Sequence, residues 1–382
     1  MSGIRAAAAL AAFSWWLVTQ PAPPAYAEAG TPPPPVELIS GQEDPVAAAI
    51  SQLREGDGLL LFAPGLRYYS ALAVSATGLR VVHVTPGKEP IGEAQFEGWE
   101  KAVPVKPESV SFREGKIAAR FGKTDVTVVS LNFITAPATR CAVLLDPDFF
   151  LPLYENEVRG GIIDLSMKLF RSMAEAGAAG FPLHVVDPLS KPSFPLQWAY
   201  AGSLWTEIWR RPDAFRDDLP VKWKMRKESE FLAGFGQFEE AARILDEAKP
   251  LFPNDGSIDF QLARLAFWDR DIPVGIRFLN RAAKIDRRYL RGYSELADYL
   301  LSRERLPAAE MVFRAGLLLD VKDPVLNAGL FRLLVDRADS RQAYEPGEAL
   351  LDLEEALPLQ VSDEMKVRAR ALVGKIRGSL PR

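Results

Sequence analysis

The sequence predicts two kinds of fold in one chain: a layered, mainly parallel α/β/α domain followed by an all-α helical solenoid. From Val36 to about Pro212, short runs rich in β-branched residues alternate with amphipathic stretches. Beyond Pro212 the pattern is wholly helical, and small and large apolar residues recur with a fixed period. With 382 residues, of which 48% are hydrophobic and 25% charged, the chain is long enough for two such domains.

Residues 1–27 have the pattern of a secretory signal peptide. Arg5 precedes the apolar run Ala6–Val18, and an Ala-Tyr-Ala sequence ending at Ala27 fits a small-x-small cleavage site. The run has 13 residues, fewer than the roughly 20 needed to span a bilayer. We therefore expect an exported protein, periplasmic or secreted, with no stable membrane span after cleavage. Residues 28–35 predict an extended, proline-rich tether.

Charge and cysteine content exclude some functions. A net charge of -4 and a pI near 5.6 leave no basic surplus to neutralise phosphates, so we expect no nucleic-acid partner. The single cysteine, Cys141, cannot form an intramolecular disulfide. It opens an apolar run, which is typical of a small buried hydrophobic residue.

The predicted elements of residues 36–212 follow one another as strands and helices. They are a helix capped by Asp44, a strand at Gly58–Phe62, a helix at Arg67–Ser75, a strand at Arg80–Val84, a hairpin over 108–122, strands at Val126–Phe133 and Cys141–Leu145, a helix at Asn156–Glu175 and a strand at Leu183–Val186. The strand candidates are nearly continuous apolar runs. Such runs fit strands that are buried on both faces of a parallel sheet.

The period of the C-terminal half is 34 residues. Three sets of positions carry it: Ala241, Gly275 and Ala309; Leu245, Leu279 and Phe313; Ala248, Ala282 and Gly316. The small residues allow paired helices to approach closely, and the large ones pack between them. The sets predict repeats at 222–255, 256–289 and 290–323. A degenerate fourth repeat begins at Pro324.

The fourth repeat fits the period only with six extra residues around Ala338–Tyr344. This insertion brings Ala349, Leu353 and Ala356 into the marker positions. Residues 362–382, whose segment Ser362–Leu380 is amphipathic and basic, are expected to form a capping helix and tail.

The segment Phe238–Ala248, followed by Pro253, closely resembles the second helix and terminating proline of a tetratricopeptide repeat. The resemblance assigns residues 213–361 to such repeats and implies binding of another protein or peptide to a groove lined by the first helices. The family's groove positions fall on Trp223, Arg226, Glu230, Phe260, Arg264, Phe267, Trp268, Arg291, Ser294 and Asp298. Alternatively, residues of the N-terminal domain cover this aromatic surface.

The N-terminal domain offers one candidate site, the pair Asp146 and Asp148 after the strand Cys141–Leu145. Ligands gather at the carboxyl ends of parallel strands, and two carboxylates two residues apart suit a divalent cation. With two aromatic residues after it, this run is similar to the arginase/deacetylase-like group, and the similarity extends over at most residues 55–210.

That resemblance implies a binuclear metal site, which the sequence does not complete. The family's earlier H-x-D-x-H-x-D run matches His83–Glu89, where threonine, glycine and glutamate replace ligands. Only Asp146, Asp148 and either His83 or Glu89 remain as candidate ligands, and His184 is expected to be a core or sheet-edge residue. We therefore expect a degenerate, hydrolase-like domain with no catalytic residue and no cofactor.

Two functional hypotheses follow. The first is an exported interaction or assembly factor that binds a polypeptide through the repeats, with an inactive α/β domain. The alternative is a metal-dependent amide or guanidino hydrolase that uses Asp146 and Asp148 with Mn²⁺ or Zn²⁺, the repeats serving as a targeting module. The incomplete ligand set favours the first hypothesis.

Overall fold

A computed structural model describes residues 35–40, 44–51, 53–75, 77–136, 138, 140–152, 161–175 and 180–379. The predicted signal peptide and residues 28–34 of the tether lie outside these ranges. The chain forms two compact units. One, the sheet unit, comprises Met1–Phe194 and Ala201–Pro220; the other, the repeat unit, comprises Pro195–Tyr200 and Val221–Arg382. The sequence placed the boundary at Pro212, whereas the chain passes between the units three times.

The sheet unit contains an eight-stranded sheet in the order β1-β8-β7-β2-β3-β6-β5-β4. The strands are β1 (Val36–Ile39), β2 (Gly58–Phe62), β3 (Arg80–Thr85), β4 (Ser109–Arg113), β5 (Lys116–Phe121), β6 (Thr124–Ser130), β7 (Cys141–Leu145) and β8 (Leu183–Val186). Among the described strands, the neighbours in the series β1-β8-β7-β2-β3-β6 run parallel to one another, whereas β5 is antiparallel to both β6 and β4. The mainly parallel sheet predicted from the apolar runs is confirmed.

Burial explains why these runs form central strands. Every residue of β2, β7 and β8 is buried, as expected for strands covered on both faces. Burial alternates along β5, which belongs to the antiparallel edge hairpin. The hairpin turns at Glu114 and Gly115, whose φ angles are 53° and 70°. This left-handed pair is the backbone that a two-residue hairpin loop requires.

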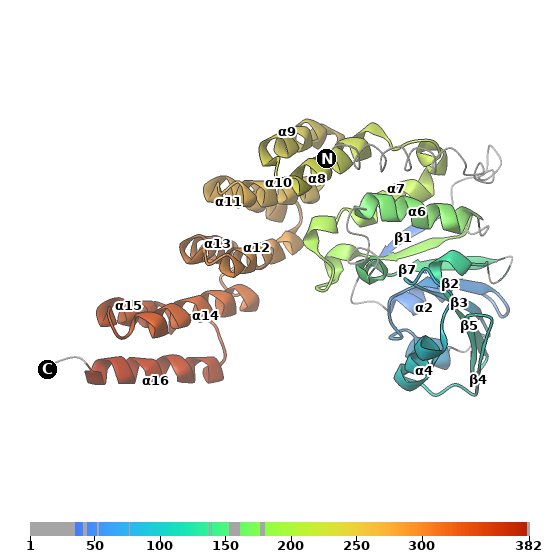
Figure 1. Ribbon diagram of the computed structural model, residues 1–382, viewed down its shortest axis with the longest axis horizontal. Helices are drawn as coiled ribbons and strands as arrows, with labels where there is room; N and C mark the ends of the chain where they lie inside the picture. Colours follow the sequence, from blue (N-terminus) through green and yellow to red (C-terminus); the bar gives the residue numbers. More distant parts are fainter. Residues whose placement is uncertain are drawn as a thin grey trace, which may run out of the picture. The chain divides into compact units, whose positions relative to one another are not determined.

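Helices cover both faces of the sheet (Figure 1). The first face carries α2 (Pro45–Ile50), α3 (Tyr69–Val74) and α4 (Glu93–Ala102), which share one apolar core with the sheet. The opposite face carries α6 (Ile162–Glu175) and α7 (Ala201–Arg210). There Phe150 stacks on Trp205 with ring centroids 4.8 Å apart. The layered α/β/α architecture is thus confirmed; residues 156–160 of the predicted helix Asn156–Glu175 lie outside the described ranges.

The connections of the sheet reverse direction between β2 and β7. The chain leaves β2 through α3 to reach β3 on one side, and it leaves β7 through α6 to reach β8 on the other. In parallel α/β sheets, the carboxyl ends of strands at such a reversal form the usual ligand crevice. In this sheet those ends are Phe62 and Leu145.

The repeat unit consists of four helix pairs and a final helix, and Figure 1 shows the pairs stacked in succession. The helices are α8 (Val221–Gly234) with α9 (Phe238–Ala248), α10 (Gly256–Trp268) with α11 (Ile272–Ile285), α12 (Arg291–Ser302) with α13 (Leu306–Leu319), α14 (Pro324–Arg341) with α15 (Pro346–Ala356), and α16 (Asp363–Ser379). The marker residues of all four repeats are buried, so the 34-residue register is confirmed.

Glycine at one marker position permits close helix packing. A methyl group at Gly275 in α11 would lie 2.9 Å from Cε2 of Phe267 in α10. The aromatic ring therefore fills the space that a larger residue would need. This contact explains why the 34-residue pattern demands a small residue there.

The fourth repeat takes up its extra residues in its first helix. α14 has 18 residues, whereas α12 has 12. After α15, helix α16 buries Ala369, Leu372 and Ile376. None of the helices in the described part of the chain combines the length and the apolar character needed to cross a bilayer.

Candidate peptide-binding face and the charge cluster of the sheet

Asp146 lies at the carboxyl end of β7, at the point where the sheet connections reverse. Its side chain is only 1% exposed. It accepts hydrogen bonds from Tyr68 Oη at 2.8 Å and from the backbone N–H of Asp148 at 3.1 Å, and it also contacts Arg67 and Lys191. Burial and the Asp146 carboxylate raise the pKa of Tyr68. The tyrosine therefore stays a neutral donor to the carboxylate.

Lys191 joins the two predicted carboxylates. Its side chain is 7% exposed, and its ammonium group forms ion pairs with Asp146 and Asp148. Ser193 Oγ adds a hydrogen bond to Asp148 at 3.1 Å. The sequence placed both aspartates at a strand end, but it did not identify their cationic partners. The result is a charge-balanced network, because a lysine and an arginine oppose the two carboxylates.

The surroundings of these carboxylates do not fit a Mn²⁺ or Zn²⁺ site. His83 is fully buried: its Nε2 donates to the carbonyl of Ala63 at 3.0 Å, and its Nδ1 accepts from Tyr69 Oη at 2.9 Å. Burial lowers the pKa of His83 to about 4. Glu89 is exposed. Within the described ranges, no three His, Cys, Asp or Glu side chains gather as metal ligands.

His184 lies in β8, where it is 6% exposed. Its Nδ1 is 3.0 Å from Oε2 of Glu37 on the neighbouring edge strand β1. Burial lowers the pKa of this histidine, and the Glu37 carboxylate opposes that effect. The residue therefore lies within the sheet, as the sequence indicated.

The inner face of the repeat unit is the surface formed by the first helices α8, α10, α12 and α14. A short stretch of the same chain, Pro195–Tyr200, belongs to the repeat unit and contacts this face. We call it the inner segment. It contains one 3-10 turn, Leu196–Trp198, and its residues Leu196, Trp198 and Tyr200 are buried.

The C-terminal end of the inner segment contacts the first repeat through an aromatic ring. The guanidinium of Arg226 on α8 lies 3.7 Å from the ring centroid of Tyr200. The ring of Trp223 lies 5.9 Å from the same ring. Arg226 is fully buried, donates to Ser257 Oγ at 2.9 Å and lies 3.9 Å from Glu230. Burial and the Glu230 carboxylate raise the pKa of Tyr200.

The rest of the inner segment is held through its backbone. Gln261 Nε2 on α10 donates to the carbonyl of Gln197 at 2.5 Å. The backbone of Leu196 lies close to the Glu295 carboxylate on α12 and favours its charged form. Burial raises the pKa of Glu295, whereas Arg291 and the Leu196 backbone oppose the change. The segment thus runs along the array from repeat three to repeat one.

The two backbone-binding residues occupy equivalent places in successive repeats. Gln261 and Glu295 are one 34-residue period apart. Neither residue was predicted from the sequence, although each is next to a predicted groove residue, Phe260 or Ser294. The 34-residue period is the sequence signal that relates the two positions. The sequence around Pro195–Tyr200 does not indicate that this segment binds there, because it precedes the repeats in the chain.

The predicted groove residues have different environments in the structure. Trp223, Arg226 and Glu230 surround Tyr200. Phe260 and Phe267 are at most 1% exposed, which differs from the predicted open surface. Both rings fill space between helices: Phe260 packs on Tyr289 with centroids 5.7 Å apart, and Phe267 packs on Gly275.

The remaining predicted residues support or flank the inner segment. Arg264 donates to Gln261 Oε1 at 2.9 Å and lies 4.5 Å from the ring of Trp268. Arg291 Nε pairs with Glu295 at 3.0 Å. Ser294 Oγ donates to the carbonyl of Arg291. These contacts orient the two side chains that hold the backbone of the inner segment.

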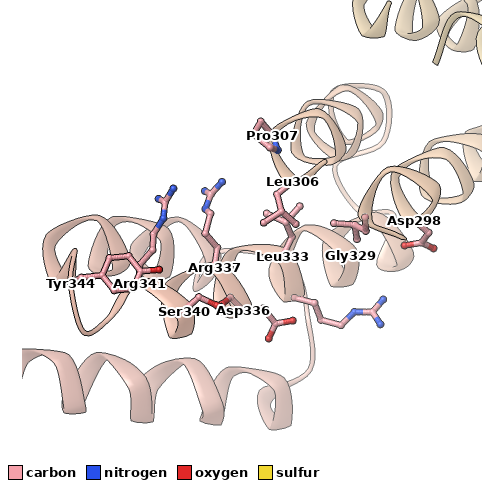
Figure 2. Close-up of a pocket in the computed structure, with 12 residues that line it drawn as sticks. Asp298, Leu306, Pro307, Gly329, Leu333, Asp336, Arg337, Ser340, Arg341 and Tyr344 are labelled. Atoms are coloured by element: carbon pink, nitrogen blue, oxygen red, sulfur yellow. The ribbon is translucent and has the colours of Figure 1, made fainter. Parts of the chain in front are cut away.

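Asp298 faces a cavity of about 590 Å³ further along the inner face. Figure 2 shows the cavity beside α14, with Asp298 at one end and Tyr344 at the other. Apolar and charged residues of both signs line it. They include Leu301, Leu306, Leu333, Arg332, Asp336 and Arg337. Burial raises the pKa of Asp298, and Arg332 opposes this effect. Arg332 is one 34-residue period after Asp298.

No protein-family model matches the chain, and curated proteins give no match either. Several solved structures are similar to it. The tetratricopeptide repeat domain of OM64 from Arabidopsis shares 18% identity over 30% of this chain and 93% of that one, with a TM-score of 0.23.

Two further solved structures are similar. TTC0263, a thermophilic tetratricopeptide repeat protein in Thermus thermophilus, shares 17% identity over 40% of this chain and 99% of that chain, with a TM-score of 0.22. YrrB, a tetratricopeptide repeat protein with an unusual peptide-binding site, shares 13% identity over 58% and 97%, with a TM-score of 0.24. Because these TM-scores are low, we assign the helical unit from its own repeat geometry.

The repeat unit is a tetratricopeptide-type helical array, because its helix pairs recur with a 34-residue period and bury the marker residues of that repeat. The chain joins this array to a mainly parallel α/β/α unit. Its particular feature is an inner face that holds a segment of its own chain.

Proposed function

We propose that the protein is an exported interaction or assembly factor that binds a polypeptide partner on the inner face of its repeats. The supporting observation is that this face already holds a polypeptide: Gln261 donates to the backbone of the inner segment, and the Arg226 guanidinium lies over the ring of its tyrosine. Side chains that bind backbone groups are suited to peptide recognition. Export is proposed from the pattern of residues 1–27.

The cavity between α12 and α14 is the proposed contact site for the partner. Leu301, Leu306 and Leu333 offer apolar surface there, and Asp298 and Arg332 add opposite charges. A pocket with an apolar floor and a few charged groups suits a side chain with its adjoining backbone. We therefore expect a partner segment that places an apolar side chain in the cavity between charged residues.

Charge reversal at the cavity tests this proposal. Asp298→Arg together with Arg332→Glu keeps the net charge but exchanges the two signs. We expect it to weaken partner binding by about 10-fold or more, because each charged group of the partner then faces a residue of the same sign. The measurement is a pull-down from the exported fraction, followed by titration of the captured partner with the purified full chain.

The matched control changes charges on second helices. Asp246 on α9 and Lys284 on α11 are exposed, and Asp246→Arg with Lys284→Glu also preserves net charge. This control is expected to retain the partner. Equal partner binding by the cavity variant and the control would exclude the cavity as the binding site.

A further inference from the structure

We propose that repeats one to three form a binding site for an extended peptide that carries an aromatic residue. The inner segment occupies this site and competes with such a peptide. The inference rests on the proposed polypeptide binding and names a second section of the same inner face. This closed section comprises Arg226, Gln261 and Glu295, each on the first helix of a different repeat. Its present occupant is Pro195–Tyr200.

The contacts define the chemistry of a suitable ligand. Two of them involve the backbone, since Gln261 donates to the carbonyl of Gln197 and the Glu295 carboxylate lies close to the backbone of Leu196, and so do not depend on the ligand's side chains there. The third is an aromatic ring on the buried Arg226 guanidinium. A ligand therefore needs exposed backbone at two adjacent residues and an aromatic side chain three residues further on.

Arg226 is built for an aromatic ligand rather than for an aliphatic one. Its guanidinium is removed from water, and the Tyr200 ring covers one of its faces at 3.7 Å. An arginine has no neutral state at physiological pH, so a group that takes it out of water must compensate the hydration that the cation loses. An aromatic ring supplies the electron-rich face that compensates the cation.

The direction of the inner segment shows how a longer partner peptide can bind more tightly than the segment does. Its N-terminal end lies close to Glu295 on α12, and the cavity between α12 and α14 lies at the next repeat. A partner peptide that binds like the inner segment and continues past its N-terminal end reaches this cavity. It then makes contacts that the six-residue occupant does not make. A competitor of this kind lowers the apparent affinity for every ligand that must displace it.

The experiment uses the purified full chain and a fluorescent eight-residue peptide with the sequence of residues 194–201, Phe-Pro-Leu-Gln-Trp-Ala-Tyr-Ala. Fluorescence anisotropy measures its binding to the wild type and to Tyr200→Ala, which removes the ring from the built-in occupant. We expect the variant to bind the peptide at least about 10-fold more tightly, because its own segment competes less. A peptide whose tyrosine is replaced by alanine is the ligand control, and it is expected not to bind.

A double variant locates the site. In the Tyr200→Ala background, Gln261→Ala removes a donor to the peptide backbone and is expected to reverse the gain. Equal peptide affinity in the wild type and Tyr200→Ala, or no binding to a Tyr200→Ala protein whose circular dichroism matches the wild type, would overturn the inference.

A measurement on the wild type removes any dependence on the folding of variants. Hydrogen exchange of the amides in Pro195–Tyr200 is expected to accelerate when the peptide saturates the protein, since the segment is displaced. Unchanged exchange at millimolar peptide would also overturn the inference. The eight-residue peptide does not extend to the cavity, so its failure to bind would leave the proposed partner site at Asp298 and Arg332 intact.

Discussion

Buried charges in both units are matched by specific partners. In the sheet unit, Lys191 contacts Asp146 and Asp148; in the repeat unit, the buried carboxylate of Asp259 pairs with Lys249 and Arg281 at 2.7 Å each. A buried ion loses its hydration, so such pairs persist only where geometry compensates that loss. The Asp146 network lies where a ligand crevice is expected, but its carboxylates are already neutralised by protein cations.

His83 makes the sheet unit sensitive to acid. Its pKa is about 4 in the folded protein, against 6.5 for an ordinary histidine, because the charged form cannot be solvated in the core. Since the folded pKa is depressed, the associated stability is complete above pH 6.5 and is lost as the pH falls towards 4. We predict a loss of roughly 3 kcal/mol in the free energy of unfolding over this interval.

Urea unfolding of the wild type and of His83→Gln at pH 7 and pH 4.5 checks this prediction. Carboxylates titrate in both proteins, so the quantity of interest is the difference between their pH dependences. The wild type should lose more stability on acidification than the variant. An identical loss in both proteins would show that His83 does not control acid sensitivity.

At the level of single residues, the sequence located some site groups and missed others. Asp146 and Asp148 follow an apolar run, so their place at a strand end was predictable. Lys191 was not, because its contact with Asp146 joins positions 45 residues apart. Similarly, Phe267 looked like a surface residue by helix position, yet the small Gly275 opposite it leaves room for its ring inside the helix pair.

Among the elements, those with a strong local pattern were predicted and those without one were not. β2, β7 and β8 have the predicted bounds because continuous apolar runs are flanked by polar or turn residues. Neither β1 nor α4 was predicted from the sequence. β1 has only four residues, and α4 buries only Trp99, so neither shows a clear periodicity. Their formation depends on pairing with β8 and on packing against the sheet.

The close pairing of α10 with α11 gives a prediction at the level of the helix. Gly275→Ala should lower the free energy of unfolding of the repeat unit by about 1–3 kcal/mol, because the new methyl group overlaps Phe267. This effect exceeds the gain of about 1 kcal/mol that alanine normally brings to a helix. Denaturant unfolding followed by far-ultraviolet circular dichroism measures the change.

Gly374 in α16 is the matched control. A methyl group there would have no neighbour within 4 Å. Gly374→Ala is therefore expected to stabilise the protein by roughly 0.5–1 kcal/mol through helix propensity alone. The two substitutions should have opposite signs. A stabilising effect at Gly275 would refute the packing explanation.

On the scale of the whole molecule, the array depends on contacts between neighbouring helices. α16 covers the last repeat and buries Ile376 to 1% exposure. We predict that Ile376→Asp lowers the free energy of unfolding by at least about 2 kcal/mol and promotes aggregation, because the terminal helix loses its apolar contact. Val367 on the same helix is 60% exposed, so Val367→Asp should change little. Thermal denaturation with light scattering compares the two, and equal behaviour would argue against a capping role.

The two-unit organisation was predictable because the hydrophobic period changes along the chain, from strand runs to a 34-residue helical repeat. The assignment of Pro195–Tyr200 to the repeat unit was not, since it depends on contacts with Gln261 and Glu295 far along the sequence. Export and the arginase-like resemblance of residues 55–210 stay predictions.

The inner segment also limits the insertions that the first three repeats can accept. Its contacts with Arg226, Gln261 and Glu295 link three successive repeats to one fixed length of backbone. An insertion within these repeats would shift one contact relative to the next, and the segment could no longer satisfy all three. The fourth repeat makes none of these three contacts and is free of that restriction. It is there, in the longer helix α14, that the six additional residues occur.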